Sequence, residues 1–485
     1  LQYSRDTFDL QSIDVLYGPS SMLFGRGSTG GVINQVVKQP GPMPAEQVSA
    51  TAGSYDYYRA TVDVNTPFSP TTAARFNAFG QDVGTSRAVM KNKDYGLAPS
   101  LAFGQGEPTR ITLFALLQHN RDQADYGVPA LDGRPAPVER DRFYGYTDDR
   151  TLQDVQSADV LIEHHFGDGG PVLRNQTQFS HYGTDARETN PASVLTGEST
   201  TSPALANGNY TTLAPGALFV KLASKDRIIE DHSWYNTTEL SGRLNSGAVR
   251  QDLLAGVDLG YESYGNQSYS AHAPGQAAGT IGSVSLLDPV YTPRPAGTFD
   301  VPGNHAQSAA DSLGVYVNDT ASPGRHFKLV GGVRWDRFSA DIRNTSSAPA
   351  YGAQTNFFTS VRGGSIWQPD KVQTYYASYG TSFDPSLEAL TLTSGQENLP
   401  PEKSRSYEVG SKYALRGDRL LLTQSLFDVR QDNVRTKDVD GNYTIAGDIR
   451  VRGYQLGISG RLAKHWQLYG GYTYLDPRVL RASDG

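Results

Sequence analysis

From about Ala45 onward the sequence alternates between short polar turns and long irregular segments, and this alternation limits the folds open to the chain. Short turns fall at 104–108, 322–325, 368–371, 416–418 and 463–465, and the long segments cover roughly 123–151, 185–226, 266–304 and 385–403. A soluble β-sandwich rarely carries several loops of this length, whereas a membrane barrel has short turns at one rim and long loops at the other. The pattern predicts an all-β protein, a transmembrane antiparallel β-barrel.

The stretches between these connections alternate residue by residue, as half-buried strands do. In 59–65, Ala60, Val62 and Val64 fall on one face and charged or polar residues on the other. Successive side chains of a strand point to opposite faces, so each such stretch predicts one strand. Counting them gives about seventeen strands.

Composition agrees with a barrel and excludes several other classes. The chain has 28 Tyr, 18 Phe and 51 Gly but only 3 Met, a mixture of strand and turn formers. Mean hydropathy is −0.47 and no long apolar run occurs, which excludes a helical membrane protein but not a barrel, whose strands show every second residue to lipid. A net charge of −7 without a basic cluster argues against nucleic acid as a partner. With no cysteine, disulfides and cysteine metal sites are excluded.

A glycine-rich stretch at 13–40 precedes the strands. It contains Gly25-x-Gly27-x-x-Gly30, the spacing of a dinucleotide-binding loop, but such a loop must open a helix. Here a β-branched stretch at 31–37 follows and ends before Pro40, which predicts a strand. We therefore expect the glycines to permit positive φ angles and close backbone packing instead.

The whole stretch resembles the end of the plug domain of TonB-dependent outer-membrane receptors. Ser21-Met-Leu-Phe-Gly-Arg-Gly-Ser-Thr-Gly-Gly-Val-Ile-Asn34 is most similar to the catecholate siderophore receptors, and the resemblance continues through 53–65, 381–390 and 398–410. It implies a barrel of about 22 strands in the full protein, of which about 17 are here. We expect 1–41 to be the C-terminal part of an N-terminal plug domain and 42–485 to be the β-barrel, incomplete at its C-terminus.

The resemblance also implies a function: active uptake of a ferric siderophore, of catecholate type, across the bacterial outer membrane. TonB of the TonB–ExbB–ExbD complex would pull on the plug through a contact segment expected outside this chain. We expect a monomer that crosses the outer membrane many times, among lipid and lipopolysaccharide, with no nucleic-acid partner.

Two alternatives remain open. One is a sister receptor for another ligand such as haem or cobalamin; haem uptake would use an outward-facing histidine, for which His272 and His305 are candidates. The other is a passive outer-membrane pore or adhesin, which would need no plug.

Two sets of residues are candidates for the mechanism, one in the plug and one that joins plug and barrel. The motif residues are Gly18, Gly25, Arg26, Gly27, Gly30, Gly31 and Asn34. Arg26 and Glu408 are candidates for an ion pair between plug and barrel, because a charge in a crowded lumen needs a partner. The resemblance supports Glu408, since Tyr-Glu-x-Gly at 407–410 matches a family pattern. The alternative is that each charge is solvated in a watery lumen.

The expected ligand, a catecholate complex of Fe³⁺, is anionic and aromatic, so guanidinium groups and aromatic rings should line its site. Loop residues of these types are Tyr126, Arg134, Arg140, Arg142, Phe143, Tyr144, Tyr146, Tyr291 and Arg294. Because iron arrives already chelated by the siderophore, we expect no cofactor and no protein-bound metal. The nine histidines are scattered, His164 and His165 point to opposite faces of a strand, and no carboxylates are paired, so we expect no catalytic residues and no enzyme activity.

Overall fold

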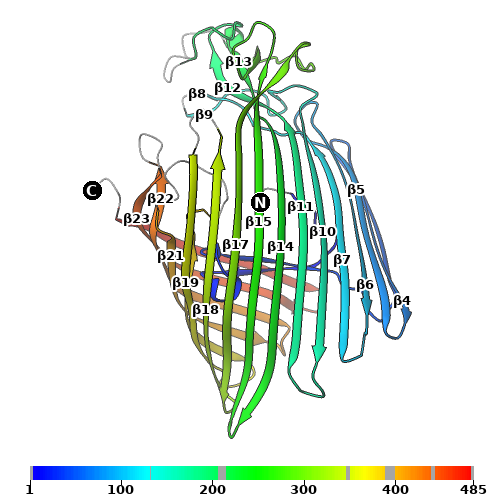
Figure 1. Cartoon of the computed structure of the whole chain (residues 1–485), viewed down its shortest axis with the longest axis vertical. Helices are drawn as coiled ribbons and strands as arrows, with labels where there is room; N and C mark the ends of the chain where they lie inside the picture. Colours follow the sequence, from blue (N-terminus) through cyan, green and yellow to red (C-terminus); the bar gives the residue numbers. More distant parts are fainter. Residues whose placement is uncertain are drawn as a thin grey trace.

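The computed structural model describes residues 4–131, 133–205, 215–345, 350–387, 399–437 and 443–481. Within these ranges, seventeen antiparallel strands form one barrel sheet, as the sequence predicted (Figure 1). They are β3 (Ala45–Gly53), β4 (Tyr57–Ser69), β5 (Thr72–Gly84), β6 (Lys91–Phe103), β7 (Thr109–Asp122), β10 (Arg150–His165), β11 (Val172–Arg187), β14 (Asp226–Ser246), β15 (Val249–His272), β17 (Phe299–Pro323), β18 (Phe327–Asn344), β19 (Ala350–Trp367), β20 (Gln373–Asp384), β21 (Glu402–Leu415), β22 (Leu420–Lys437), β23 (Tyr443–Ala463) and β24 (Trp466–Arg481).

All five predicted short turns lie between consecutive strands. They join β6 to β7, β17 to β18, β19 to β20, β21 to β22 and β23 to β24. The long segments connect strands at the opposite end, where Figure 1 shows the loops gathered above the sheet. The two rims of the barrel therefore differ as the sequence indicated.

The long segments are more regular than predicted. They contain β8 (Ala130–Leu131) paired with β9 (Arg134–Pro135), a three-stranded sheet of β12 (Thr189–Leu195), β13 (Phe219–Ser224) and β16 (Thr280–Ser285), and the short 3₁₀ turn η2 (Pro215–Ala217). β15 and β17 also continue to pair through 269–272 and 299–302, inside the segment predicted to be irregular. Long loops contain many backbone polar groups, and pairing with one another satisfies them. Most of the predicted loop at 385–403 lies outside the described residues.

The barrel strands place apolar side chains outside and small or polar ones inside. In β6, Tyr95 and Leu97 are exposed, whereas Gly96 and Ala98 are buried. A Cβ on Gly96 would lie 2.7 Å from the Phe79 ring, so a larger residue would collide with the packed interior. An apolar outer face with a filled, polar interior is the arrangement of a barrel that faces lipid.

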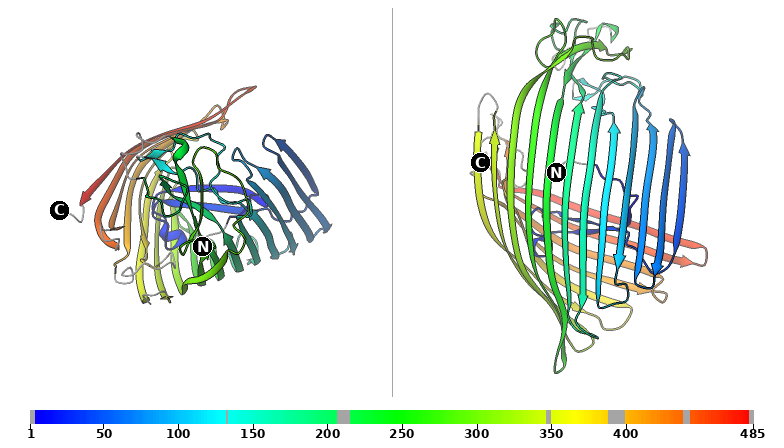
Figure 2. Two further views of the ribbon diagram at one scale, coloured as in Figure 1. Left: turned by 90° about the horizontal axis from the view of Figure 1, so that it is seen from above. Right: turned by 45° about the vertical axis from the view of Figure 1, so that its right-hand side comes forward.

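The first described segment, residues 4–41, forms a small unit of its own inside the curve of the sheet (Figure 2), and it is called the plug unit below after the resemblance noted in the sequence, with 18–30 as the plug loop. β1 (Leu10–Tyr17) pairs antiparallel with β2 (Gly31–Val37), the strand predicted at 31–37, and the four-residue helix α1 (Ser21–Phe24) lies in the loop between them. Phe8 packs with Phe79, Leu116 and Val155 of the barrel wall. The barrel sheet begins afterwards, at β3.

Among the described helical residues, none forms a helix with the length and hydropathy of a membrane span.

Candidate functional site

The loop between β1 and β2 brings the glycine-rich motif against the barrel wall. Gly25 caps the C-terminal end of α1, and its φ of 73° lies in the left-handed region that favours glycine. A Cβ on Gly25 would lie 3.1 Å from a guanidinium nitrogen of Arg334 on β18. The absence of a side chain at this position therefore lets the loop turn directly against β18 and directs the next residue, Arg26, into the wall.

Arg26 forms an ion pair between plug and barrel. Its guanidinium bonds the carboxylate of Glu262 on β15, and Tyr235 on β14 donates its hydroxyl to the same carboxylate. The guanidinium also lies over the Phe338 ring, 4.6 Å from the centroid. Both charged side chains are mostly buried, with exposures of 16% for Arg26 and 10% for Glu262. Separating them would leave two charges in a poorly solvated place.

The predicted pairing of Arg26 with Glu408 is wrong. Glu408 lies on β21 and accepts a hydrogen bond from the Tyr376 hydroxyl of β20. Both Glu262 and Glu408 face the barrel interior, so strand alternation could not choose between them. Which glutamate pairs with Arg26 depends on the position of the plug loop in the barrel. The loop places Gly25 and Arg26 against β14, β15 and β18.

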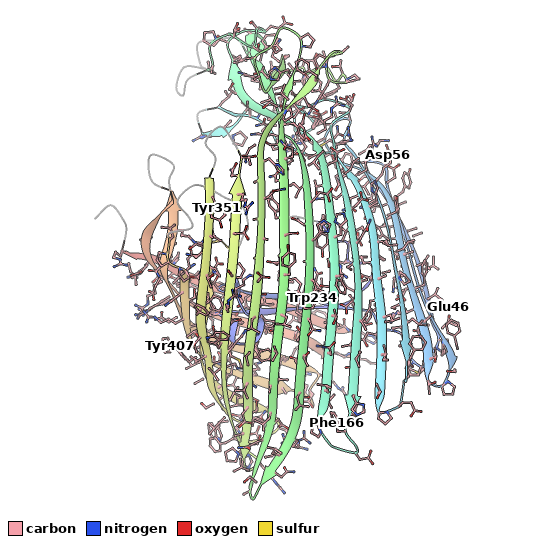
Figure 3. All side chains as sticks on the ribbon, in the orientation of Figure 1. Glu46, Asp56, Phe166, Trp234, Tyr351 and Tyr407 are labelled. Atoms are coloured by element: carbon pink, nitrogen blue, oxygen red, sulfur yellow. The ribbon has the colours of Figure 1, made fainter. Side chains whose placement is uncertain are left out.

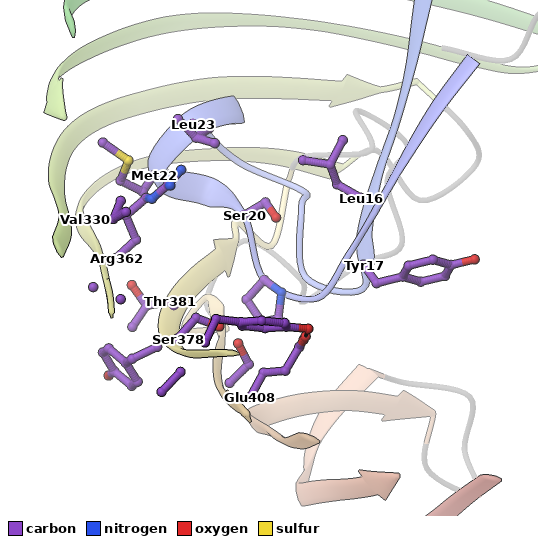
Figure 4. Close-up of a pocket in the computed structure, with 18 of the residues that line it drawn as sticks. Leu16, Tyr17, Ser20, Met22, Leu23, Val330, Arg362, Ser378, Thr381 and Glu408 are labelled. Atoms are coloured by element: carbon purple, nitrogen blue, oxygen red, sulfur yellow. Dashed lines mark hydrogen bonds between the residues drawn. The ribbon is translucent and has the colours of Figure 1, made fainter. Parts of the chain in front are cut away.

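Glu408 instead lines a cavity of about 520 Å³ between plug and barrel. Figure 4 shows Leu16, Tyr17 and Ser20 of the plug on one side of this cavity, with Arg362 and Glu408 of the barrel across from them. The cavity near Glu408 is larger than the one of about 200 Å³ that Arg26 lines.

A second charged group lies beside Arg26. Arg334 on β18 is buried, with its guanidinium 2.5 Å from a carboxylate oxygen of Asp258 and 2.8 Å from one of Asp336. Arg26, Arg334 and both of these carboxylates line one small cavity. Two cations and three carboxylates, including Glu262, therefore meet where the plug loop touches the wall.

Further ion pairs hold the two ends of the plug unit. Near its start, the Asp6 carboxylate accepts two hydrogen bonds from Arg59 on β4, at 2.7 and 2.8 Å. After β2, the Lys38 ammonium lies 3.0 Å from the Asp63 carboxylate, also on β4. These two ion pairs, together with the packing of Phe8 against the wall, hold both ends of the unit against β4 and its neighbours.

The other motif residues have different roles. Gly18, Gly27 and Gly31 have positive φ angles of 83°, 76° and 146°. Gly30 does not, and a Cβ there would meet no atom within 4 Å, so the predicted need for glycine is not seen at Gly30. Asn34 makes one long hydrogen bond of 3.4 Å to exposed Asp14 of β1.

Several predicted ligand residues are buried in the loops. Phe143, Tyr144 and Tyr146 are at most 6% exposed, and Tyr144 and Tyr146 belong to a hydrophobic cluster that includes Leu222 and Ile281 of the three-stranded loop sheet. Tyr144 donates its hydroxyl to the Leu286 carbonyl and Tyr146 to the Ile281 carbonyl, and burial raises the pKa of each phenol to about 12. These rings hold the loops together and do not present a surface to a ligand.

Arg294 is buried in the same region. Its guanidinium bonds Asp226 at 2.5 and 2.9 Å, Asp149 at 3.2 Å and the Glu188 carbonyl at 2.8 Å. Burial raises the pKa of Asp149 to about 6, although the neighbouring Arg294 opposes this shift. Arg294 thus joins three loop segments by charge-assisted hydrogen bonds.

The remaining ligand candidates are more accessible. Tyr126 is 42% exposed and donates its hydroxyl to Glu188, and Arg134 and Arg140 are exposed. Arg142 and Tyr291 are half-buried, and the Tyr291 hydroxyl accepts a hydrogen bond from the Phe143 amide. Of the nine candidates, the structure leaves these five in positions that a solute can approach.

The two histidines considered for haem lie on neighbouring strands. His272 ends β15 and stacks with Phe299, and His305 lies in β17, where its carbonyl accepts the Thr345 amide. In the pairing of β15 with β17, His272 is opposite Phe299 and His305 is opposite Gln267. The two histidines therefore lie at different heights along the barrel axis.

Sequence reasoning missed Glu262, Tyr235 and the Arg334 group. Glu262 carries a weak signal, because strand alternation in 257–264 puts it on the inner face among apolar outward residues such as Tyr261. Its pairing with Arg26 depends on contacts more than 200 residues apart in sequence, as the separation of 236 shows.

Comparisons with known proteins agree with this architecture. The family described as "TonB dependent receptor-like, beta-barrel" matches residues 102–485. The chain is 31% identical to the probable TonB-dependent receptor BfrD of Bordetella pertussis, covering 99% of this chain and 66% of that protein. It is 28% identical to the catecholate siderophore receptor Fiu of Escherichia coli strain UTI89, covering 99% and 67%. The chain thus spans about two thirds of the length of these curated relatives.

A comparison with solved structures also finds a siderophore receptor. The crystal structure of the siderophore receptor PiuA from Acinetobacter baumannii superposes with a TM-score of 0.88 and 25% identity, covering 99% of this chain and 70% of that one. With the family match over most of its length, the plug loop inside the barrel and the asymmetric rims, this chain belongs to the TonB-dependent receptor-like β-barrel family.

Proposed function

We propose that the protein takes up a ferric siderophore across the bacterial outer membrane, with TonB of the TonB–ExbB–ExbD complex supplying the work. The observation that carries this proposal is the plug loop, held in the barrel by Arg26 and Glu262 and by the ion pairs to β4. A passive pore or adhesin needs no plug unit inside the barrel. The chain's family consists of transport receptors and not of enzymes, and its members are outer-membrane barrels.

The proposed division of the chain follows from this function. Residues 1–41 serve as the C-terminal part of the plug and 42–485 as barrel, in a monomer surrounded by lipid and lipopolysaccharide. The siderophore's own oxygens hold the iron, so uptake needs no resident cofactor. The catecholate class is supported by the likeness to the catecholate siderophore receptor Fiu of Escherichia coli.

For the ligand we propose contact with the accessible loop residues Tyr126, Arg134 and Arg140. An aromatic, anionic complex favours rings and guanidinium groups. The buried residues Tyr144 and Arg294 do not contact the ligand in this proposal; their hydrogen bonds to Leu286 and Asp226 hold the loops in place.

The test is growth of an iron-starved strain that lacks its own receptors and expresses the complete gene. Growth on a ferric catecholate, lost when TonB is deleted, is the expected result. Growth on haem or cobalamin alone would instead support a sister receptor. TonB-independent passage of small solutes, with the protein present in the outer membrane, would support a passive pore.

A further inference from the structure

Three side chains that can bind a metal meet on the outer face of the barrel, on the opposite side of the wall from the plug. His181 on β11 pairs in register with His232 on β14, and Glu230 lies two residues before His232. The two Nδ1 atoms are 3.2 Å apart, and His181 Nε2 is 3.4 Å from a Glu230 carboxylate oxygen. One ligand atom from each of the three residues lies within 4.8 Å of the others.

Strand alternation places this group outside. Tyr182, next to His181, is buried with Phe8 of the plug, and Asp231, between Glu230 and His232, is 1% exposed. Because successive side chains point to opposite faces, His181, Glu230 and His232 point away from the lumen. No plug movement is needed to reach them.

The local sequence leaves room for an ion. Gly183 lies beside the group, and a Cβ there would approach Glu230 to 3.7 Å and His181 Nε2 to 3.9 Å. On the next strand, Ser263 and Gly265 are the register partners of His232 and Glu230. Small residues therefore flank the group at Gly183 and on the β15 side, whereas on the β10 side the register partner of His181 is Gln156.

The height of the group suits polar side chains. Directly below it, Phe179 on β11 contacts Trp234 on β14, which Figure 3 shows on the front of the sheet. His181 is nine residues from the start of β11 at Val172, or about 30 Å along the strand. On a tilted strand this is near the outer edge of an apolar band that is about 25 Å tall and bordered by aromatic rings.

We propose that His181, His232 and Glu230 form a surface site for a divalent transition metal, with Zn²⁺ the best match. Two imidazoles and one carboxylate suit Zn²⁺, whereas Mg²⁺ and Ca²⁺ prefer oxygen ligands only. Ligands at about 2.1 Å in a tetrahedron lie about 3.4 Å apart. His181 turns Nδ1 toward His232 and Nε2 toward Glu230, and one ion would use only one of these nitrogens. With one ligand atom from each residue the set lies within 4.8 Å, so small side-chain rotations would close it around one ion. The fourth position faces outward, and the bound ion clamps β11 to β14.

The test titrates ZnCl₂ into the full-length receptor in detergent, stripped of metal by a chelator, against a chromophoric competitor. We expect one Zn²⁺ per chain, and a loss of affinity of roughly tenfold or more in His181→Ala and in His232→Ala. The matched control is His119→Ala, because His119 and Asp154 form an outward-facing pair with one histidine only, at 2.8 Å. Its Zn²⁺ affinity should not change.

Two further measurements separate binding from folding. Co²⁺ in place of Zn²⁺ should give the visible absorption of a tetrahedral site in the wild type and not in the His181→Ala, His232→Ala double variant. Each variant is first shown to be folded by its heat-dependent migration on gels. Equal Zn²⁺ binding by the wild type and the double variant, or no binding by a folded wild type, would overturn the proposal.

Discussion

At the scale of single residues, two glycines of one motif differ in what they tolerate. Gly25 has a φ of 73° and packs against Arg334, whereas Gly30 lies outside the left-handed region with open space around it. We expect Gly25→Ala to destabilise the plug by about 1 to 3 kcal/mol, since both backbone strain and a close contact oppose it. Gly30→Ala should have little effect. Protease sensitivity of the plug loop compares the two, and equal sensitivity would contradict this assignment.

The pair of Arg26 and Glu262 gives a second residue-scale prediction. Arg26→Ala and Glu262→Gln each leave a buried charge or its partners unpaired, so each should loosen the plug. In a double-mutant cycle we expect a coupling of about 1 to 3 kcal/mol, measured by hydrogen exchange in the plug loop. A cycle of Arg26→Ala with Glu408→Gln is the control and should be additive. Coupling to Glu408 and not to Glu262 would restore the original prediction.

At the scale of elements, the loop sheet should respond to pH through Asp149. Burial raises its pKa to about 6 from an ordinary 3.8, so the folded loops bind its proton more tightly than the unfolded chain does. Their stability should therefore fall as pH rises from about 4 to 6, by up to about 3 kcal/mol. Hydrogen exchange of the loops, corrected for intrinsic rates, measures this. Asp149→Asn should remove the dependence, and a rise in stability over the same window would show that the Arg294 pairing dominates.

At the scale of the whole molecule, the sequence predicted the barrel better than the site. Period-two alternation and turn residues are local, and they were enough for the strands, the five short turns and β2. The partner of Arg26 could not be predicted from local pattern, because both Glu262 and Glu408 satisfy the same alternation. The actual partner, Glu262, is 236 residues away in sequence. The burial of Tyr144 also depends on β13 and β16, short strands that pair only with other loop segments, and the burial of Arg294 depends on distant Asp149 and Asp226. Residue type indicated an aromatic, cationic ligand surface there, and packing placed those side chains in a core instead.

Uptake as proposed requires the plug unit to move within the barrel, and the absence of cysteine from this chain permits a direct test. A Cβ on Gly18 would lie 4.0 Å from the Ser406 hydroxyl oxygen on β21, so cysteines at these two positions would be neighbours, and a disulfide needs their Cβ atoms about 3.5 to 4.5 Å apart. Gly18→Cys with Ser406→Cys should abolish siderophore uptake when oxidised and recover it on reduction. Gly18→Cys alone controls for strain at its φ of 83°, and its activity should not depend on redox conditions. Full uptake by the oxidised, cross-linked protein would mean that the ligand passes while this end of the plug stays fixed to β21.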